Sequence, residues 1–353
     1  MDKIITFRLS KNFIMLDFLY DYDMYHFNDG KDYSKHIKDD HLDAGITLCD
    51  KLLEPSIMRY GPASVASGCC PFLDDPRNPL HGWKSRTGAA ADLVFHDWVN
   101  QEKAPSHLCE DMDKNSDIEF DRLITYAGSE FICMGVKKNN NRYAFHENIR
   151  DFNNPENKPI YVTHGYTLEA KEKRKNIPVG NRAMWRRNEG ETIYHSRRNL
   201  RAHHIRVSEY FTLLDFCHSL YGIEHNINTV PKINSTKVIY GARMFGEVLD
   251  PIVKEYGRIS VLRGLEPKEM REDKNAKYHN WHIHDVDGSQ HISVIFTSSV
   301  KIPESAFSHF AVAKVQISDK YVNDCGYVYQ IDIKSFKILK AWSSGRKIIL
   351  KNT

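Results

Sequence analysis

The pattern of apolar and polar positions is the same in both halves of the chain: a stretch with helical spacing is followed by a short apolar stretch of strand type. Residues 46–60 and residues 243–256 place apolar side chains at helical spacing, and a glycine follows each run, at Gly61 and Gly257. A short apolar run of strand type begins two positions after each glycine. These two runs are residues 63–66 and residues 259–262. The pattern therefore predicts a helix, a glycine stop and a strand in each half.

Two blocks of sequence also recur in register. Residues 7–18 read FRLSKNFIMLDF, and residues 205–216 read IRVSEYFTLLDF. Residues 53–68 read LEPSIMRYGPASVASG, and residues 249–264 match them without a gap as LDPIVKEYGRISVLRG. Two matching blocks in the same order predict a tandem duplication. The alternative is that each block is a common helix start or a common helix–glycine–strand unit.

These patterns set the expected fold class and boundaries. Ser10 and Ser208 stand just before the apolar runs of the first block, where a serine predicts a helix N-cap. Near the C-terminus, YVYQIDIKSFKILKAW and then KIIL alternate apolar and polar residues, which predicts two or three strands. We expect an α+β fold, with helices packed on a small antiparallel sheet, present twice. The expected division is residues 1–150, a connector at 151–203, and residues 204–353.

Short motifs follow the strand of the first copy. Ser67-Gly68 is followed by GAAAD at residues 88–92 and then by a strand-like run at residues 131–135. This order resembles the zinc D-alanyl-D-alanine carboxypeptidase family, especially its phage-encoded members, which have the Hedgehog/DD-peptidase fold. The resemblance spans residues 5–145 and again residues 203–315. It implies a zinc ion held by a His and an Asp of one motif and by a His on a late strand.

The first copy departs from the family at most ligand positions. Ser85 stands where the motif has its His, Cys133 stands where the late strand has its His, and Cys69 replaces an Arg. Only Asp92 keeps a metal-binding side chain at its family position. A catalytic zinc needs three protein ligands and an open position for water. Because His81 and Cys133 are good ligand types, a site of His81, Asp92 and Cys133 is the alternative expectation for this copy.

The second copy departs differently. When Gly288 is aligned with Gly88, Asp285 takes the His position. In the same alignment Ile292 takes the Asp position, and His309 falls where the late ligand belongs. This copy therefore keeps one family ligand, and a different one from the first copy.

The densest group of histidines lies in the second copy, in YHNWHIHDVDGSQH. His282 and His284 alternate, so a strand would present both on one face at a spacing typical of metal ligands. His-x-His also occurs in rolling-circle nicking enzymes, but no clear context for their catalytic Tyr surrounds Tyr278 or Tyr321. A polar loop and strand without metal is the remaining interpretation. We expect two pseudo-enzyme domains without a cofactor. The alternative is bound zinc, for which the candidate ligands are His81, Asp92, Cys133, His282, His284, His291 and His309.

Residues 171–206 form a strongly basic segment. Eleven Lys and Arg stand against three Glu, with Trp185 and Tyr194 interleaved, so the rest of the chain is net acidic at an overall charge of +3. Basic side chains neutralise phosphates, and aromatic side chains stack on unpaired bases. The segment predicts a nucleic-acid site, with a charged linker or a site for an acidic protein as alternatives. The predicted contact residues are Lys173, Arg174, Lys175, Arg182, Trp185, Arg186, Arg187, Tyr194, Arg197, Arg198 and Arg201.

Composition narrows the class of protein. With 41% hydrophobic and 27% charged residues, the chain has globular composition. It has no stretch of eighteen apolar residues and no basic start followed by an apolar core, so we expect neither a membrane span nor an export signal. The seven cysteines, with Cys69 and Cys70 adjacent, indicate free thiols in a reducing compartment. The expected location is the cytoplasm, of the host if the protein is viral, or a virion.

These features predict a non-catalytic phage or viral protein. Its two peptidase-like domains would form a scaffold, and its connector would bind nucleic acid in an accessory role in replication or transcription. One alternative is a virion structural protein whose surfaces contact other viral subunits. The other is a zinc-dependent D,D-peptidase that acts on peptidoglycan.

Overall fold

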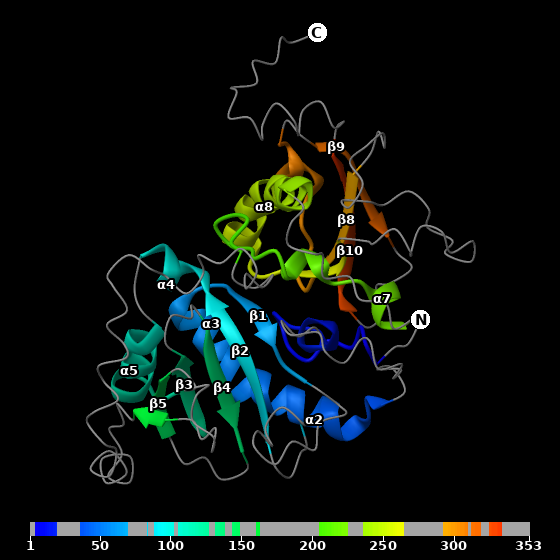
Figure 1. Cartoon of the computed structure of the whole chain (residues 1–353). Coiled ribbons are helices and arrows are strands. Elements are labelled where there is room, and N and C mark those ends of the chain that lie inside the picture. The colour runs from blue at the N-terminus through cyan, green and yellow to red at the C-terminus, as the bar shows by residue number, and fades with distance from the viewer. Residues whose placement is uncertain are drawn as a thin grey trace. The chain divides into compact units, whose positions relative to one another are not determined.

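The structure is a computed structural model, and it divides the chain into two compact units (Figure 1). The central unit is residues 39–200, and the terminal unit combines residues 1–38 with residues 201–353. The described residues are 4–19, 36–69, 83, 88–101, 105–126, 131–137, 143–148, 160–162, 205–224, 236–264, 292–309, 312–318 and 325–333.

The central unit begins with one continuous helical run. Its elements are α2 (Asp39–Leu48), the π-helical turn η3 (Cys49–Leu53) and α3 (Glu54–Tyr60). Leu48, Leu52 and Leu53 recur at helical spacing and are fully buried. The run ends at Gly61, whose φ of +88° strains any residue with a side chain. The predicted helix and glycine stop of the first half are therefore confirmed.

A six-stranded sheet follows, in the order β1-β2-β4-β3-β5-β6. The strands are β1 (Ala63–Ser67), β2 (Ala89–Phe95), β3 (Arg122–Tyr126), β4 (Ile132–Val136), β5 (Tyr143–Asn148) and β6 (Ile160–Val162). The first four in spatial order pair antiparallel, whereas β5 adds to β3 in parallel. Between β2 and β3 the chain forms α4 (His96–Asn100) and α5 (Pro105–Asn115). Helix α2 lies against β2 and β4, and α5 lies against β3 and β5.

The terminal unit is built from both ends of the chain. Its helical elements are η1 (Met15–Phe18), η7 (Asp215–Cys217), α7 (Leu220–Glu224), α8 (Thr236–Tyr256) and η8 (Glu304–Phe307). Its strands are β7 (Ser260–Arg263), β8 (Ile292–Ser298), β9 (Val312–Ser318) and β10 (Tyr327–Ile333). They form an antiparallel sheet in the order β7-β8-β10-β9. Helix α8 ends at Gly257 with a φ of +90°, as α3 ends at Gly61.

Aromatic side chains pack against one another in the core of the terminal unit. Tyr329 of β10 packs on Phe296 of β8 with ring centroids 5.3 Å apart, and on Phe307 of η8 at 5.6 Å. The buried Tyr329 hydroxyl accepts the Ile302 N–H at 2.6 Å, which satisfies its polar end. These contacts hold η8 against the sheet.

The two units share the order of their first four strands. The spatial orders β1-β2-β4-β3 and β7-β8-β10-β9 have the same sequence of connections, and all these pairs are antiparallel. The first strand of each set also has an irregularity before its last residue, between Val65 and Ser67 and between Val261 and Arg263. The fold is therefore α+β, and the helix, glycine and strand predicted in each half are present.

Residues 7–18 and residues 205–216 adopt similar local structure, and both segments belong to the terminal unit. Each forms an isolated antiparallel bridge and then a 3-10 helix. Phe13 and Phe18 pack with ring centroids 5.3 Å apart. In the second segment Phe211 and Phe216 pack at 5.2 Å, with the same interplanar angle of 41°.

The predicted N-caps at Ser10 and Ser208 are wrong. The Ser10 N–H donates to the Phe13 carbonyl at 3.2 Å, and Ser208 makes the same turn with Phe211 at 3.4 Å. Both serines therefore lie at the tip of a short hairpin, and no helix begins there. The first part of the run after each serine, up to Ile14 and Thr212, forms the second arm of that hairpin because its backbone pairs with the first arm. A 3-10 helix follows within each run.

Three further expectations concern domains, membranes and thiols. Residues 1–38 group with the C-terminal half, whereas the predicted division at 150 follows the sequence repeat. Among the described residues no helix is both long and apolar enough to cross a bilayer. The described cysteines have free thiols, as expected, and all are buried: Cys49, Cys69, Cys109, Cys133, Cys217 and Cys325.

Candidate functional site

Two of the predicted metal ligands lie side by side in the central unit. Asp92 of β2 and Cys133 of β4 are directly opposed in the antiparallel pairing. Opposed residues point to one face of the sheet, with Cβ atoms about 4.5–5.5 Å apart. Both side chains are buried, at 2% and 1% exposure. Strand pairing thus brings a carboxylate and a thiol together.

The neighbours of this pair are less suited to metal. Ser67 of β1 opposes Asp92 on its other side, and Ile124 of β3 opposes Cys133. A carboxylate and a thiolate are zinc ligand types, but a zinc site needs further protein ligands. In the part of the chain that the structure describes, no three His, Cys, Asp or Glu side chains are grouped to hold a metal ion. The row Ser67, Asp92, Cys133 and Ile124 therefore supplies two ligand types at most.

The terminal unit has a different row at the same place in its sheet. Beyond the irregularity of β7, the opposed residues are Arg263, Ile295, Gln330 and Gln316. The side chains of this row are one guanidinium, one aliphatic group and two amides. The pairing of a carboxylate with a thiol has no counterpart in it.

The strand register also corrects the sequence alignment of the second copy. Ile295, not Ile292, stands at the place of Asp92, because strand pairing rather than the distance from a glycine sets the position. Gln330 of β10, not His309, stands at the place of the thiol. His309 follows η8 and precedes β9, where partial burial lowers its pKa.

The remaining predicted site residues lie outside the described residues. These are His81, His282, His284, His291, Lys173, Arg174, Lys175, Arg182, Trp185, Arg186, Arg187, Tyr194, Arg197, Arg198 and Arg201.

A Ser–His pair in the central unit was missed in the sequence. The Ser64 Oγ of β1 lies 2.7 Å from the His96 Nε2 at the start of α4. Such a pair can activate a hydroxyl nucleophile when substrate reaches it. Here both side chains are buried, at 3% and 0% exposure, so the hydrogen bond satisfies two polar groups inside the core.

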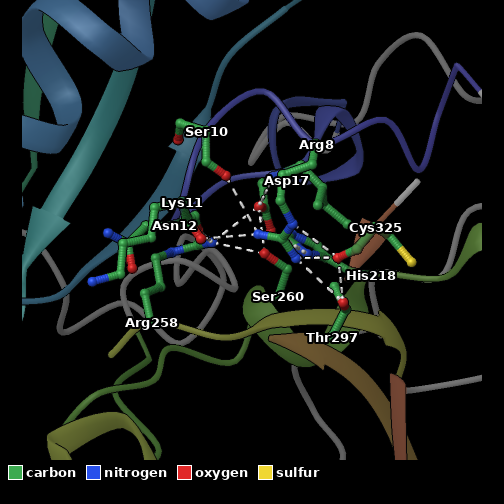
Figure 2. Close-up of polar contacts among 11 residues, drawn as sticks. Arg8, Ser10, Lys11, Asn12, Asp17, His218, Arg258, Ser260, Thr297 and Cys325 are labelled. Atoms are coloured by element: carbon green, nitrogen blue, oxygen red, sulfur yellow. Dashed lines mark hydrogen bonds and ion pairs between the residues drawn. The ribbon is translucent and has the colours of Figure 1, made fainter. Parts of the chain in front are cut away.

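The terminal unit contains a buried carboxylate, that of Asp17, which accepts several hydrogen bonds (Figure 2). Its Oδ2 accepts hydrogen bonds from Arg258 Nη1 at 2.9 Å and from Ser260 Oγ at 2.6 Å. The Ile14 N–H donates to the same oxygen at 2.9 Å. We call Asp17, Arg258 and Ser260 the Asp17 cluster. It joins the N-terminal hairpin to the strand β7, which begins 243 residues later.

Arg258 contacts the N-terminal hairpin, residues 7–18, at further points besides its ion pair with Asp17. Its Nη1 also donates to the Asn12 carbonyl at 2.8 Å, and its guanidinium lies 4.5 Å from the centroid of the Phe13 ring. The side chain is almost fully buried, so its pairing with Asp17 is shielded from water. One arginine therefore contacts the backbone, the ring and the carboxylate of the same hairpin.

Arg8 makes a second attachment of the hairpin (Figure 2). Its Nε donates to the Cys325 carbonyl at 2.9 Å, and its Nη2 donates to Thr297 Oγ1 at 3.3 Å. The Thr297 hydroxyl donates to the same carbonyl at 2.6 Å. The hairpin thus contacts the end of β8 and the residues just before β10.

His218 lies beside the Asp17 cluster, with its Nδ1 4.0 Å from Asp17 Oδ1. Burial lowers the pKa of His218, although the nearby carboxylates of Asp17 and Asp215 act in the opposite direction. Arg258 adds to the lowering. A neutral imidazole at neutral pH follows from the net direction.

The sequence repeat gave a signal for two members of the Asp17 cluster, because Asp17 and Ser260 recur as Asp215 and Ser64. Asp17 recurs as Asp215, whose Oδ2 accepts the Thr212 N–H at 2.7 Å. The counterpart of Arg258 in the first copy is Pro62, so the repeat contains no hint of the buried ion pair.

Comparison with known proteins found no matching family model, no matching curated protein and no matching solved structure.

The first prediction concerns the buried ion pair. Arg258→Ala leaves the Asp17 carboxylate buried without its cation and should lower the free energy of unfolding by about 3–5 kcal/mol. Urea unfolding followed by circular dichroism measures this change. Lys301→Ala removes an exposed cation from the same unit and should leave the unfolding curve nearly unchanged. Equal curves for the two variants would contradict the role assigned to the cluster.

The second prediction concerns pH. Because the folded pKa of His218 lies below its unfolded value of about 6.5, the unfolded state binds the proton more tightly. Its contribution to stability is present above that value and is lost as pH falls below it, by at most about 1.4 kcal/mol per pH unit. Urea unfolding between pH 7.5 and 5.5 should show this loss, and His218→Gln should reduce it. His309→Gln is the comparison, with a smaller effect because His309 is only partly buried. If the free energy of unfolding of His218→Gln depends on pH as strongly as that of the unmodified chain, His218 is not the cause of the loss.

Proposed function

We propose that the chain is a tandem duplication of one small α+β domain related to the zinc D,D-peptidases, and that it is not a catalyst. We propose further that it binds nucleic acid through residues 171–206. The setting would be a phage or virus, in an accessory role in replication or transcription.

The shared topology supports the duplication. The helix–glycine–strand unit, the order of the next three strands and the irregularity in the first strand occur in both units. The hairpins at residues 7–18 and residues 205–216 add a second matching element that lies far from the first in the sequence. Two independent matches in the same order favour descent from one domain over two unrelated α+β folds.

The identity of the residues in the ligand row supports the loss of catalysis. In the first copy the pair Asp92 and Cys133 is flanked by a serine and an isoleucine. In the second copy an isoleucine and a glutamine occupy the same places. The two copies have changed differently at these positions, as expected where a metal no longer constrains them.

The composition of residues 171–206 carries the nucleic-acid proposal. Eleven basic residues against three acidic ones give the segment a net charge of +8 within a chain of net +3. Arg and Lys contacts to phosphates release counterions, so the free energy of such binding depends on salt. Trp185 and Tyr194 add flat surfaces on which unpaired bases can stack.

The test of this proposal is a salt series. A labelled single-stranded oligonucleotide should bind the whole chain, and its affinity, read by fluorescence anisotropy, should fall steeply as salt rises. Arg186→Glu with Arg187→Glu should weaken binding to every sequence and flatten the salt dependence. The matched control, Lys314→Glu with Lys301→Glu, reverses two exposed charges outside the connector and should keep the affinity. Equal affinity in both variants would remove the connector from the site.

The opposition of Asp92 and Cys133 favours one second candidate, a zinc site retained in the first copy. Its third ligand would be His81. Such a site would polarise a peptide carbonyl and supply hydroxide for D,D-peptidase chemistry.

Zinc content separates the two candidates. We expect no stoichiometric zinc in the purified chain after dialysis, as measured by inductively coupled plasma mass spectrometry. A retained site would instead give one zinc per chain, lost in Cys133→Ser and kept in Cys109→Ser, which alters another buried thiol of the same unit. It would also give chelator-sensitive cleavage of D-Ala-D-Ala peptides.

A further inference from the structure

His218 lies between the N-terminal hairpin and the first strand of the terminal sheet. Its side chain is buried at 1% exposure, and its Nδ1 is 4.0 Å from Asp17 Oδ1 of η1 (Figure 2). Its backbone carbonyl accepts the Gly264 N–H at 3.0 Å, just after the end of β7. His218 itself directly follows η7. One residue thus lies against η1, η7 and β7.

The two oxygens of the Asp17 carboxylate have different surroundings. Oδ2 accepts the hydrogen bonds of Arg258, Ser260 and the Ile14 N–H. Oδ1 accepts no hydrogen bond from any residue in the described part of the chain. The 4.0 Å between Oδ1 and the imidazole of His218 is too long for a hydrogen bond. In this part of the chain, hydrogen bonds therefore fix the carboxylate only on the side that faces Arg258 and Ser260.

Charged groups face His218 from each of the segments packed around it. They are Asp17 of η1, Asp215 of η7 and Arg258, which precedes β7. Burial lowers the pKa of His218 most strongly, the two carboxylates raise it, and Arg258 lowers it. A charged imidazole at this place lacks the water that would solvate it. The ring therefore binds a proton more tightly when water reaches it.

We propose that protonation of His218 loosens the contact between the N-terminal hairpin and β7, so that this attachment responds to acid while the sheet stays folded. Movement of η1 away from His218 would admit water to the ring. The sheet can stay closed, because the aromatic contacts among Phe296, Phe307 and Tyr329 involve no residue of the hairpin. This inference does not depend on nucleic-acid binding, so either can fail without the other.

Hydrogen exchange of the unmodified chain between pH 7.5 and 5.5 tests the proposal. Two amides report on the attachment: that of Ile14, bonded to Asp17 Oδ2, and that of Gly264, bonded to the His218 carbonyl. After correction for the intrinsic exchange rate, their protection should fall below about pH 6.5, by up to about tenfold per pH unit. The amides of β10 should keep their protection.

Two results of this experiment would overturn the proposal. One is constant protection at Ile14 and Gly264 over the whole pH range. The other is an equal loss in β10, which would show that the whole unit opens and that the hairpin has no separate response.

A variant identifies the group that takes up the proton. His218→Gln keeps a polar side chain that cannot be charged, so the protection of Ile14 and Gly264 should no longer depend on pH. His309→Gln is the matched control, because it removes a partly buried imidazole of the same unit and should leave the dependence unchanged. A dependence that persists in His218→Gln would contradict the assignment.

A second measurement applies if His218→Gln does not fold. Nuclear magnetic resonance of the unmodified chain with isotope-labelled histidine follows the titration of His218 itself. Its midpoint should lie below about pH 6.5 and coincide with the loss of protection at Ile14. Titration without that loss, or loss without titration, would overturn the proposal.

Discussion

The buried carboxylate of Asp17, held by Arg258 and Ser260, decides which parts of the chain form a unit. A carboxylate removed from water is stable only when charge and hydrogen bonds compensate it, and the same holds for a buried guanidinium. Each group therefore requires the other, although 241 residues separate them. Together with the contacts of Arg8, this pair attaches the N-terminal hairpin to the terminal unit, so residues 1–38 group with residues 201–353.

The same scaffold positions carry different polar partners in the two units. Ser260 donates to Asp17, whereas Ser64, at the matching place, pairs with His96. The row across the sheet changes in the same way, from a carboxylate and thiol to an isoleucine and glutamine. In each case the backbone pairing is kept and the side-chain chemistry is replaced. Both observations agree with the duplication proposed above, in which the two copies do not share one reaction.

Local patterns predicted the local parts of this fold. A helix that ends at a glycine of positive φ depends on neighbouring residues only, so Gly61 and Gly257 were visible from the sequence. The sequence predicted Asp92 and Cys133 as candidate ligands of one site, and the pairing of β2 with β4 places them opposite each other. The hairpins at Ser10 and Ser208 were misread as helix starts because their pairing depends on backbone contacts that a serine before an apolar run does not distinguish. The position of Ile295 was missed because strand pairing, and not the spacing of a loop, sets it. Arg258 had no signal, since its partner lies at the other end of the chain.

The central claim is that residues 171–206, and not the sheets of the two units, contact nucleic acid. Ultraviolet cross-linking of a photoreactive single-stranded oligonucleotide to the whole chain, followed by mass spectrometry of the cross-linked peptides, tests it most directly. The account predicts cross-links within residues 171–206, at Trp185 or Tyr194 and their basic neighbours, that disappear at high salt. Cross-links confined to the sheets, or none at low salt, would contradict it.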